Sequence, residues 1–183
     1  MKFTEIPLKD AFIINSEPLI DSRGMFERIF CKNEFNKIGL KREIVQINHS
    51  LTKKSGSIRG MHYQIPPFAE IKMVRCIKGS VFDVIVDIRK CSETFLKWQG
   101  EILSSENMKI IYIPEGFAHG FQTLEDDCEL LYFHTEFYNK NYERTIRHND
   151  PLINIKWKID ITEISEKDKN YPLLNKNFQG VIL

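Results

Sequence analysis

Residues 71–88, IKMVRCIKGSVFDVIVDI, decide the fold class of this 183-residue chain. Two runs rich in β-branched residues, Ile71–Ile77 and Val81–Ile88, flank Lys78-Gly79-Ser80, and this spacing predicts two strands joined as a hairpin. Alternate residues of a strand point to opposite faces. The second run therefore predicts one face with Phe82, Val84, Val86 and Ile88, and another with Val81, Asp83, Ile85 and Asp87.

More short extended segments surround this stretch, and close turns separate them. Helical signals are few: one lies near residues 33–38, and one follows Ser165, where Ser165-Glu166-Lys167-Asp168 resembles a capping box. Many short strands predict a mainly β protein, a sandwich or barrel for which a jelly roll is suitable. We find no repeat or linker and expect a single domain over residues 1–183. The other expected strands are 43–50, 56–64, 109–113, 117–124 and 129–135.

Composition argues against nucleic-acid and membrane proteins. Lys plus Arg is 26 and Asp plus Glu is 25, so the formal net charge of +1 provides no general attraction for anionic partners. No stretch approaches the ~20 apolar residues of a membrane span, and the N-terminus lacks the apolar core of a signal peptide. The four cysteines are scattered, without the close pairs of a zinc or redox motif. We expect a reduced, cytoplasmic protein without nucleic-acid or membrane partners.

Histidines are the first candidates for chemistry. Pro114-Glu115-Gly116-Phe117-Ala118-His119 matches the P-x-G-x-x-H element of cupin jelly rolls, but the earlier H-x-H element supplies only His62, with Gln64 in the second position. Two histidines without further ligands make a poor metal site, so we expect no metal. A regular strand would point Arg59 and His62 to opposite faces; a bulge at Gly60 would change this, or the glycine marks close approach of another backbone or a ligand.

Six motifs occur in the order typical of one family, between about Asp21 and Leu174. Together they resemble the dTDP-4-dehydrorhamnose 3,5-epimerase family, which implies a metal-free cupin-type jelly roll acting in bacterial surface-polysaccharide synthesis. The motifs are Arg59–Gln64 (RGMHYQ), Lys72–Gly79 (KMVRCIKG), Val81–Arg89 (VFDVIVDIR), Ile113–Phe121 (IPEGFAHGF), Asn149-Asp150-Pro151 and Ser165–Asp168 (SEKD).

The resemblance implies a cofactor-independent isomerase with four catalytic residues. A ketone at C4 of a sugar acidifies the hydrogens on C3 and C5, so inversion needs a base, a proton donor on the opposite face and a cation near the enolate. His62 is implied as the base and Tyr132 as the acid, with Lys72 stabilising the enolate. Asp168 is implied to orient His62, although Asp83 is a second candidate partner for His62 or Lys72.

The resemblance also implies a nucleoside-diphosphate sugar substrate and a homodimer that exchanges an N-terminal segment. Arg23 belongs to that segment, which reaches the partner's site in relatives. Cations, amide donors and a stacking surface suit a nucleotide diphosphate. The implied substrate-binding residues are Arg23, Gln46, Asn48, Arg59, His119, Tyr138, Glu143 and Lys167.

Three positions depart from the family pattern: Arg28 replaces a glutamate, Ile47 a polar residue and His148 a tryptophan. Arginine can engage guanine O6 and N7. Arg28 is therefore a further candidate substrate-binding residue, and a GDP-linked 4-keto heptose or hexose inverted at C3, C5 or both stays an alternative substrate. Two other classes remain for comparison: a non-catalytic sugar-nucleotide binder, and a metal-dependent oxygenase for which ligands are lacking.

Overall fold

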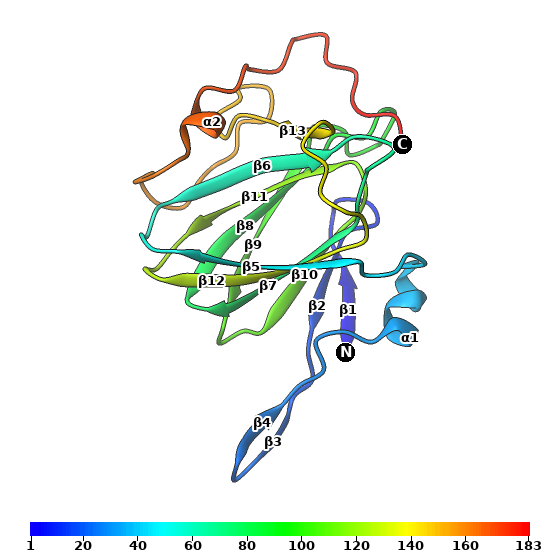
Figure 1. Ribbon diagram of the computed structural model, residues 1–183, viewed down its shortest axis with the longest axis vertical. Coiled ribbons are helices and arrows are strands. Elements are labelled where there is room, and N and C mark those ends of the chain that lie inside the picture. Colours follow the sequence, from blue (N-terminus) through cyan, green and yellow to red (C-terminus); the bar gives the residue numbers. More distant parts are fainter.

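The computed structural model describes residues 1–183 as two antiparallel sheets that face each other, with a hairpin extending from the body (Figure 1). This arrangement confirms the predicted mainly β, cupin-like jelly roll. The larger sheet has six strands in the order β1-β2-β10-β7-β12-β5. These strands are β1 (Lys2–Glu5), β2 (Phe12–Asn15), β10 (Lys109–Ile113), β7 (Lys72–Lys78), β12 (Cys128–His134) and β5 (Gln46–Thr52).

The second sheet has five strands in the order β13-β6-β11-β8-β9. Its outer side carries the C-terminal part of the chain, which crosses it as irregular loops and a short helix (Figure 1). The strands are β13 (Glu143–Thr145), β6 (Ile58–Gln64), β11 (Phe117–Thr123), β8 (Ser80–Asp87) and β9 (Trp98–Ser104).

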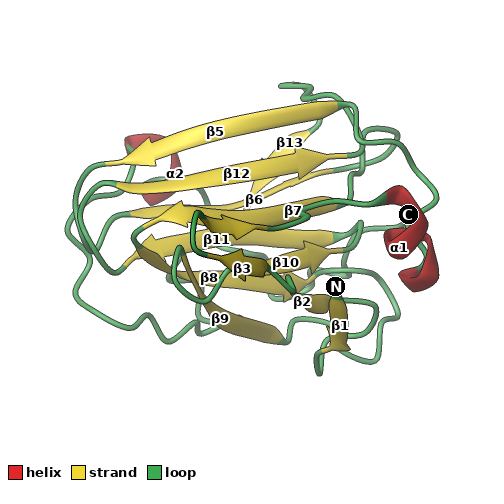
Figure 2. Ribbon diagram, turned by 90° about the horizontal axis from the view of Figure 1, so that it is seen from below, coloured by secondary structure: helices red, strands yellow, loops and turns green.

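Helices are few and short, as predicted. They are α1 (Lys32–Phe35), the 3-10 turn η1 (Asn36–Ile38) and α2 (Glu166–Lys169), and the two ends of the sandwich hold them (Figure 2). None is long or apolar enough to cross a bilayer. The projecting hairpin consists of β3 (Leu19–Asp21) and β4 (Gly24–Phe26). Sequence reasoning missed this hairpin and strands β1, β2, β9 and β13.

Strand β8 lies between two apolar cores, and its residues divide between them as the two predicted faces. Val81 and Ile85 belong to the cluster between the sheets. Phe82 and Val84 belong to the cluster on the outer side, where Ile153 and Trp157 of the C-terminal segment cover them. Because both faces of β8 are buried, the strand is apolar along most of its length.

The predicted hairpin between residues 71–77 and 81–88 is wrong. Strand β7 pairs with β10 and β12, whereas β8 pairs with β9 and β11, so the two lie in different sheets. Gly79 forms the corner between them with a φ of 75°. A Cβ there would lie 2.8 Å from Sγ of Cys128, so the turn packs too closely for a side chain. A tight glycine turn is compatible with a change of sheet as well as with a hairpin.

Candidate active site

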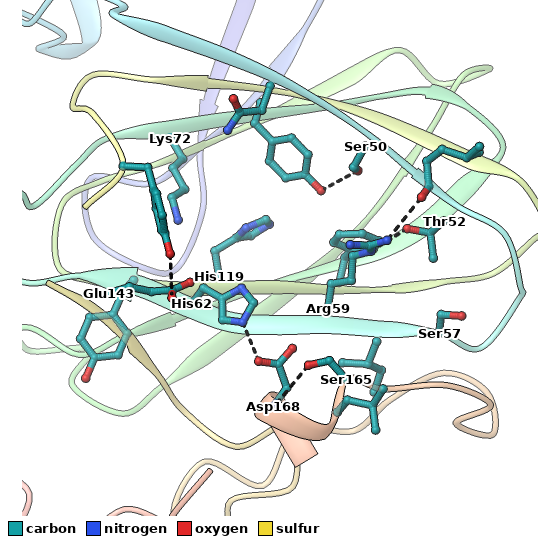
Figure 3. A pocket seen from close by; sticks show the side chains of 18 of the residues that line it. Ser50, Thr52, Ser57, Arg59, His62, Lys72, His119, Glu143, Ser165 and Asp168 are labelled. Atoms are coloured by element: carbon teal, nitrogen blue, oxygen red, sulfur yellow. Dashed lines mark hydrogen bonds and ion pairs between the residues drawn. The ribbon is translucent and has the colours of Figure 1, made fainter. Parts of the chain in front are cut away.

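A cleft of about 1430 Å³ opens between strands of the two sheets, and mostly polar side chains line it (Figure 3). Strands β6, β11 and β13 of the smaller sheet supply one wall, and β5, β7 and β12 of the larger sheet supply the other. Ten of the residues predicted for the site line this cleft: Gln46, Asn48, Arg59, His62, Lys72, His119, Tyr132, Tyr138, Glu143 and Asp168.

His62 on β6 is paired with a buried carboxylate. Its Nε2 lies 2.7 Å from Oδ1 of Asp168, a residue that is only 4% exposed. Ser165 caps helix α2 by accepting from the backbone N–H of Asp168 at 3.1 Å, which fixes the carboxylate beside the strand (Figure 3). Burial acts to raise the pKa of Asp168, but the hydrogen bond and charge of His62 outweigh it and the pKa lies below its usual value. In neutral His62 the Nε2–H therefore donates to Asp168, which leaves Nδ1 with a free lone pair.

Asp83 does not contact His62. Its carboxylate lies 3.0 and 2.9 Å from Nε2 of His119, through Oδ1 and Oδ2 respectively. Both residues are buried, on neighbouring strands β8 and β11. The structure thus pairs each cleft histidine with its own carboxylate, and it assigns Asp168 rather than Asp83 as the partner of His62.

Gly60 brings Arg59 and His62 to the same cleft. Between its pairings with His119 and Phe121 of β11, strand β6 contains one extra residue. This is the bulge predicted from the sequence. The predicted close approach is also present, since a Cβ on Gly60 would lie 2.5 Å from the Cα of Gly120.

Arg59 is oriented by strand β5 across the cleft. Its Nε donates to Oγ1 of Thr52 at 2.9 Å, and its Nη2 donates to the carbonyl of Leu51 at 3.3 Å. The guanidinium keeps further N–H donors, which are suited to a phosphate. The side chain therefore bridges the two sheets while presenting a cation at the cleft (Figure 3).

Tyr132 on β12 faces the cleft from the larger sheet. Its phenol oxygen lies 3.1 Å from Oγ of Ser50, and its ring meets that of His119 edge to face with centroids 6.4 Å apart. Burial raises the pKa of Tyr132 well above its usual value, although the Ser50 hydrogen bond acts in the other direction. The phenol is consequently protonated throughout the neutral pH range.

Lys72 on β7 enters the cleft beside the carboxylate of Glu70. Its Nζ lies 3.0 Å from Oε1 of Glu70, and the two side chains are 13% and 7% exposed. Figure 3 shows the ammonium group pointing into the space between the two sheets. A partly buried lysine with one ion-pair partner supplies a cation inside the cleft.

The outer part of the cleft carries a polar array around an exposed aromatic ring. Gln46 donates to Oδ1 of Asn48 at 3.2 Å and accepts from the backbone N–H of Tyr138 at 3.2 Å. The Tyr138 phenol donates to Glu143 at 3.2 Å, and Lys167 donates to the same carboxylate. Burial acts to raise the pKa of Glu143, but Lys167 lowers it below its usual value. Lys167 thus joins the site through Glu143.

The chain contains no cluster of three or more His, Cys, Asp or Glu side chains arranged to hold a metal ion. Gln64, in the place of a second cupin histidine, has a structural role. Its amide donates to the carbonyls of Phe68 and Phe137 at 3.1 and 3.2 Å and accepts from the N–H of Asn139 at 2.6 Å.

Comparison with known proteins identifies the family. The profile of the family described as dTDP-4-dehydrorhamnose 3,5-epimerase matches residues 5–176. The chain belongs to this family. The Shigella flexneri enzyme of that name is 48% identical over 168 residues, with 91% of each chain covered. A crystal structure of the Elizabethkingia anophelis enzyme superposes with a TM-score of 0.92 at 40% identity and covers 97% of this chain and 98% of that one.

A structure of the Legionella pneumophila enzyme in complex with dTDP-4-keto-L-rhamnose also matches, with a TM-score of 0.91 and 35% identity, covering 96% of this chain and 94% of that one. Family membership makes the chain an epimerase, which confirms the predicted enzyme class.

Three predicted residues of this epimerase do not line the cleft of their own chain: Arg23, Arg28 and Lys167, the last of which reaches it through Glu143. Arg23 is at the tip of the β3–β4 hairpin with its side chain 88% exposed, and it pairs with Asp21 at 2.5 Å. The guanidinium of Arg28 pairs with Glu34 of α1 at 3.0 Å. Arg23 and Arg28 stay predictions for a site that the hairpin of another subunit would complete.

Sequence reasoning missed four polar residues of the epimerase cleft. Ser50 and Thr52 follow Gln46 and Asn48 at intervals of two on β5, and His134 follows Tyr132 in the same way on β12. Glu70 precedes Lys72 by two residues. Alternation along a strand places Ser50, Thr52 and His134 on the faces of their predicted neighbours, so these three could have been found. Glu70 precedes strand β7, and only the structure places it beside Lys72.

Proposed function

We propose that this epimerase inverts C3 and C5 of a dTDP-linked 4-keto-6-deoxy sugar through an enolate, with His62 as the base and Tyr132 as the acid. One observation carries the proposal: His62 on β6 and Tyr132 on β12 come from opposite sheets and line one cleft. Inversion requires removal of a proton from one face of a carbon and its return to the other. Groups on facing walls meet that requirement.

The reaction begins with transfer of the C3 proton to Nδ1 of His62, since Nε2 is engaged with Asp168. The electron pair of the C–H bond enters the C3–C4 bond, and the C4 carbonyl oxygen becomes an enolate oxygen. Lys72 stabilises this oxygen as a nearby cation, and Asp168 stabilises the imidazolium. Tyr132 then donates its phenolic proton to the opposite face of C3 and recovers one from solvent. His62 releases its proton to solvent, and the same sequence at C5 gives the second inversion.

Tyr132 fits the acid role because burial raises the pKa of its phenol. The group enters each turnover protonated, and the enolate carbon is basic enough to take the proton. Ser50, 3.1 Å away, stabilises the phenolate that forms by donating its hydroxyl proton.

The outer cleft suits the nucleotide. The volume of the whole cleft, about 1430 Å³, exceeds the ~300–1,000 Å³ of pockets for drug-sized ligands, as a nucleoside-diphosphate sugar requires. Arg59 is placed for the diphosphate and the exposed ring of Tyr138 for stacking on the base. We choose dTDP because the Legionella relative was solved with a dTDP-linked keto sugar.

A homodimer with exchanged hairpins is part of the proposal. The β3–β4 hairpin leaves the body and exposes large apolar side chains: Leu19 is 72%, Ile20 77% and Phe26 68% exposed (Figure 1). Contiguous exposed apolar groups of this kind mark protein interaction sites. In a dimer the hairpin would bury them on the partner and bring Arg23 to the partner's cleft. The product would serve surface-polysaccharide synthesis in the cytoplasm.

Solvent deuterium exchange tests the mechanism. His62→Ala is expected to slow exchange at both C3 and C5 by ~10²–10⁴-fold, the contribution of a positioned base, while dTDP binding is retained. Glu106→Ala is the control, because Glu106 is exposed and does not line the cleft. Near-normal exchange in His62→Ala would remove His62 from the mechanism. Wild-type protein that binds dTDP sugars without exchange would support a non-catalytic binder.

A further inference from the structure

A buried carboxylate joins two side chains of the cleft that the mechanism treats separately. Oε1 of Glu70 lies 3.0 Å from Nζ of Lys72, and Oε2 lies 2.7 Å from Nδ1 of His134. The three side chains are between 7% and 13% exposed. Burial acts to raise the pKa of Glu70, but Lys72 and His134 outweigh it and hold the pKa below its usual value. The carboxylate is therefore ionised, and each of its oxygens has its own donor.

A series of hydrogen bonds connects His134 with the outer cleft, and each member donates toward Glu70. Since Nδ1–H donates to Glu70, neutral His134 has an acceptor at Nε2, and Nδ2 of Asn48 lies 3.3 Å from it. Asn48 in turn accepts from Gln46, which accepts from the backbone N–H of Tyr138. Every donor in this series meets an acceptor. Chains of aligned hydrogen bonds strengthen their members.

His134 is also held by packing. Its ring stacks on that of Tyr132 with centroids 6.2 Å apart and an interplanar angle of 21°. Strand β12 carries both rings, and register pairs His134 directly with Lys72 of β7 and with Gln46 of β5. The imidazole is thus fixed by backbone pairing, stacking and both ring nitrogens.

Lysine needs such support if it is to act on an enolate. Its ammonium is a point charge on a flexible four-carbon stem, and an unrestrained one would occupy many positions in a wide cleft. Catalytic electrostatic stabilisation depends on groups that are in place before charge develops. Glu70 is the only side chain of this chain that pairs with Lys72.

We propose that Glu70 is a positioning residue for Lys72, and that His134 fixes the carboxylate of Glu70 by occupying its second oxygen. The inference rests on the proposed function, in which Lys72 stabilises the enolate. It adds two residues to the reaction and connects Lys72 with the nucleotide-binding residues Asn48 and Gln46.

Glu70→Gln is the informative substitution, because an amide of nearly the same shape has only one acceptor. If its oxygen faces Lys72, its N–H₂ group meets Nδ1–H of His134 and the ring must move its proton to Nε2. If its oxygen faces His134, the N–H₂ group meets Lys72 and displaces the ammonium. We expect kcat to fall by about 10- to 150-fold, the range for one lost hydrogen bond to a charged group, with the Kd for dTDP unchanged.

Nitrogen-15 NMR of the His134 ring supplies a readout that needs no turnover. Wild-type protein is expected to have the proton on Nδ1, and Glu70→Gln to have a lower kcat with the proton on either ring nitrogen. A wild-type ring with its proton on Nε2 would overturn the inference, as would a Glu70→Gln protein with wild-type kcat.

Two further variants complete the test. Glu101→Gln removes another carboxylate–lysine pair, to Lys109 at 2.5 Å and outside the cleft, and is expected to keep wild-type kcat. His134→Phe preserves the ring stack but removes Nδ1–H, and is expected to lower kcat by about 3- to 10-fold, less than Glu70→Gln, because Glu70 keeps its pair with Lys72. Wild-type kcat in Glu70→Gln would reject the role of Glu70, and wild-type kcat in His134→Phe alone would reject the role of His134. A wild-type protein without epimerase activity would instead reject the proposed function, while the NMR result would still stand on its own.

Discussion

Asp168→Asn is the perturbation that most directly tests how His62 is prepared for catalysis. The wild-type carboxylate accepts the Nε2–H of His62 at 2.7 Å, and the backbone N–H of Gly60 also acts on it to lower its pKa. An asparagine side chain has one acceptor oxygen for these two donors. Either its oxygen faces His62 and its N–H₂ group opposes Gly60, or the reverse arrangement forces His62 to protonate Nδ1, the nitrogen that must accept the substrate proton.

The magnitude follows from the bond that is weakened. A hydrogen bond to a charged group contributes ~1.5–3 kcal/mol, and each 1.36 kcal/mol is a factor of ten in rate. We therefore expect kcat to fall by about 10- to 150-fold, and further, up to ~10⁴-fold, if the wrong tautomer dominates. The assay is inversion of a dTDP-linked 4-keto sugar together with C3 and C5 exchange in deuterated water. Asp160→Asn, at an exposed position, is the control. A folded Asp168→Asn protein with kcat within about twofold of wild type would refute the role of the pair.

The same substitution has a pH signature in stability. The pKa of Asp168 is lower in the folded protein than the ~3.9 of an unperturbed aspartate. The carboxylate therefore stabilises the fold at pH values above about 4, and this contribution is lost as the pH falls through the folded pKa. We expect Asp168→Asn to lower the Tm at pH 7 and the difference from wild type to shrink below about pH 4. A Tm difference that is constant from pH 7 to pH 3, measured by calorimetry, would contradict the assignment.

Three further outcomes are expected. Tyr132→Phe should retain part of the deuterium exchange but lose inversion, so that deuterium enters the substrate with retained configuration. Unimpaired inversion would show that another group donates the proton. Wild type should prefer dTDP over GDP sugars in kcat/KM, as expected from the dTDP-linked ligand of the Legionella relative, and Arg28→Glu should not change this preference. A GDP preference that the substitution reverses, by the ~1–3 kcal/mol of an arginine–guanine contact, would restore the GDP hypothesis. Gly60→Ala should lower the Tm by several degrees more than Gly24→Ala. The two glycines have nearly the same φ, 129° and 128°, but only Gly60 lies against the backbone of β11. Equal losses of Tm would show that φ strain alone determines the effect.

The sequence by itself predicts much of the fold and of the site. Alternation along residues 81–88 predicts which residues share each face of strand β8, and the structure shows that both faces are buried because the C-terminal segment covers the outer one. At Gly60 the sequence offered a bulge or a close approach of another backbone, and the structure has both. These features depend on neighbours along the chain, and the strand period reports them directly. The family motifs supplied the candidate residues, and ten of them line the cleft.

Pairing between distant segments was decided only by the tertiary structure. The turn at Gly79 has the same local chemistry in a hairpin and in a corner, and the stacking of two sheets determined that it is a corner. The resemblance implied Asp168 as the partner of His62 and left Asp83 as a second candidate, because a sequence does not state which carboxylate a fold brings within 3 Å of a ring nitrogen. Helix α2 carries Asp168 across 106 residues of chain to β6, while the register of β8 with β11 gives Asp83 to His119. A side-chain contact of that kind depends on the three-dimensional path of the whole backbone, which local patterns do not contain.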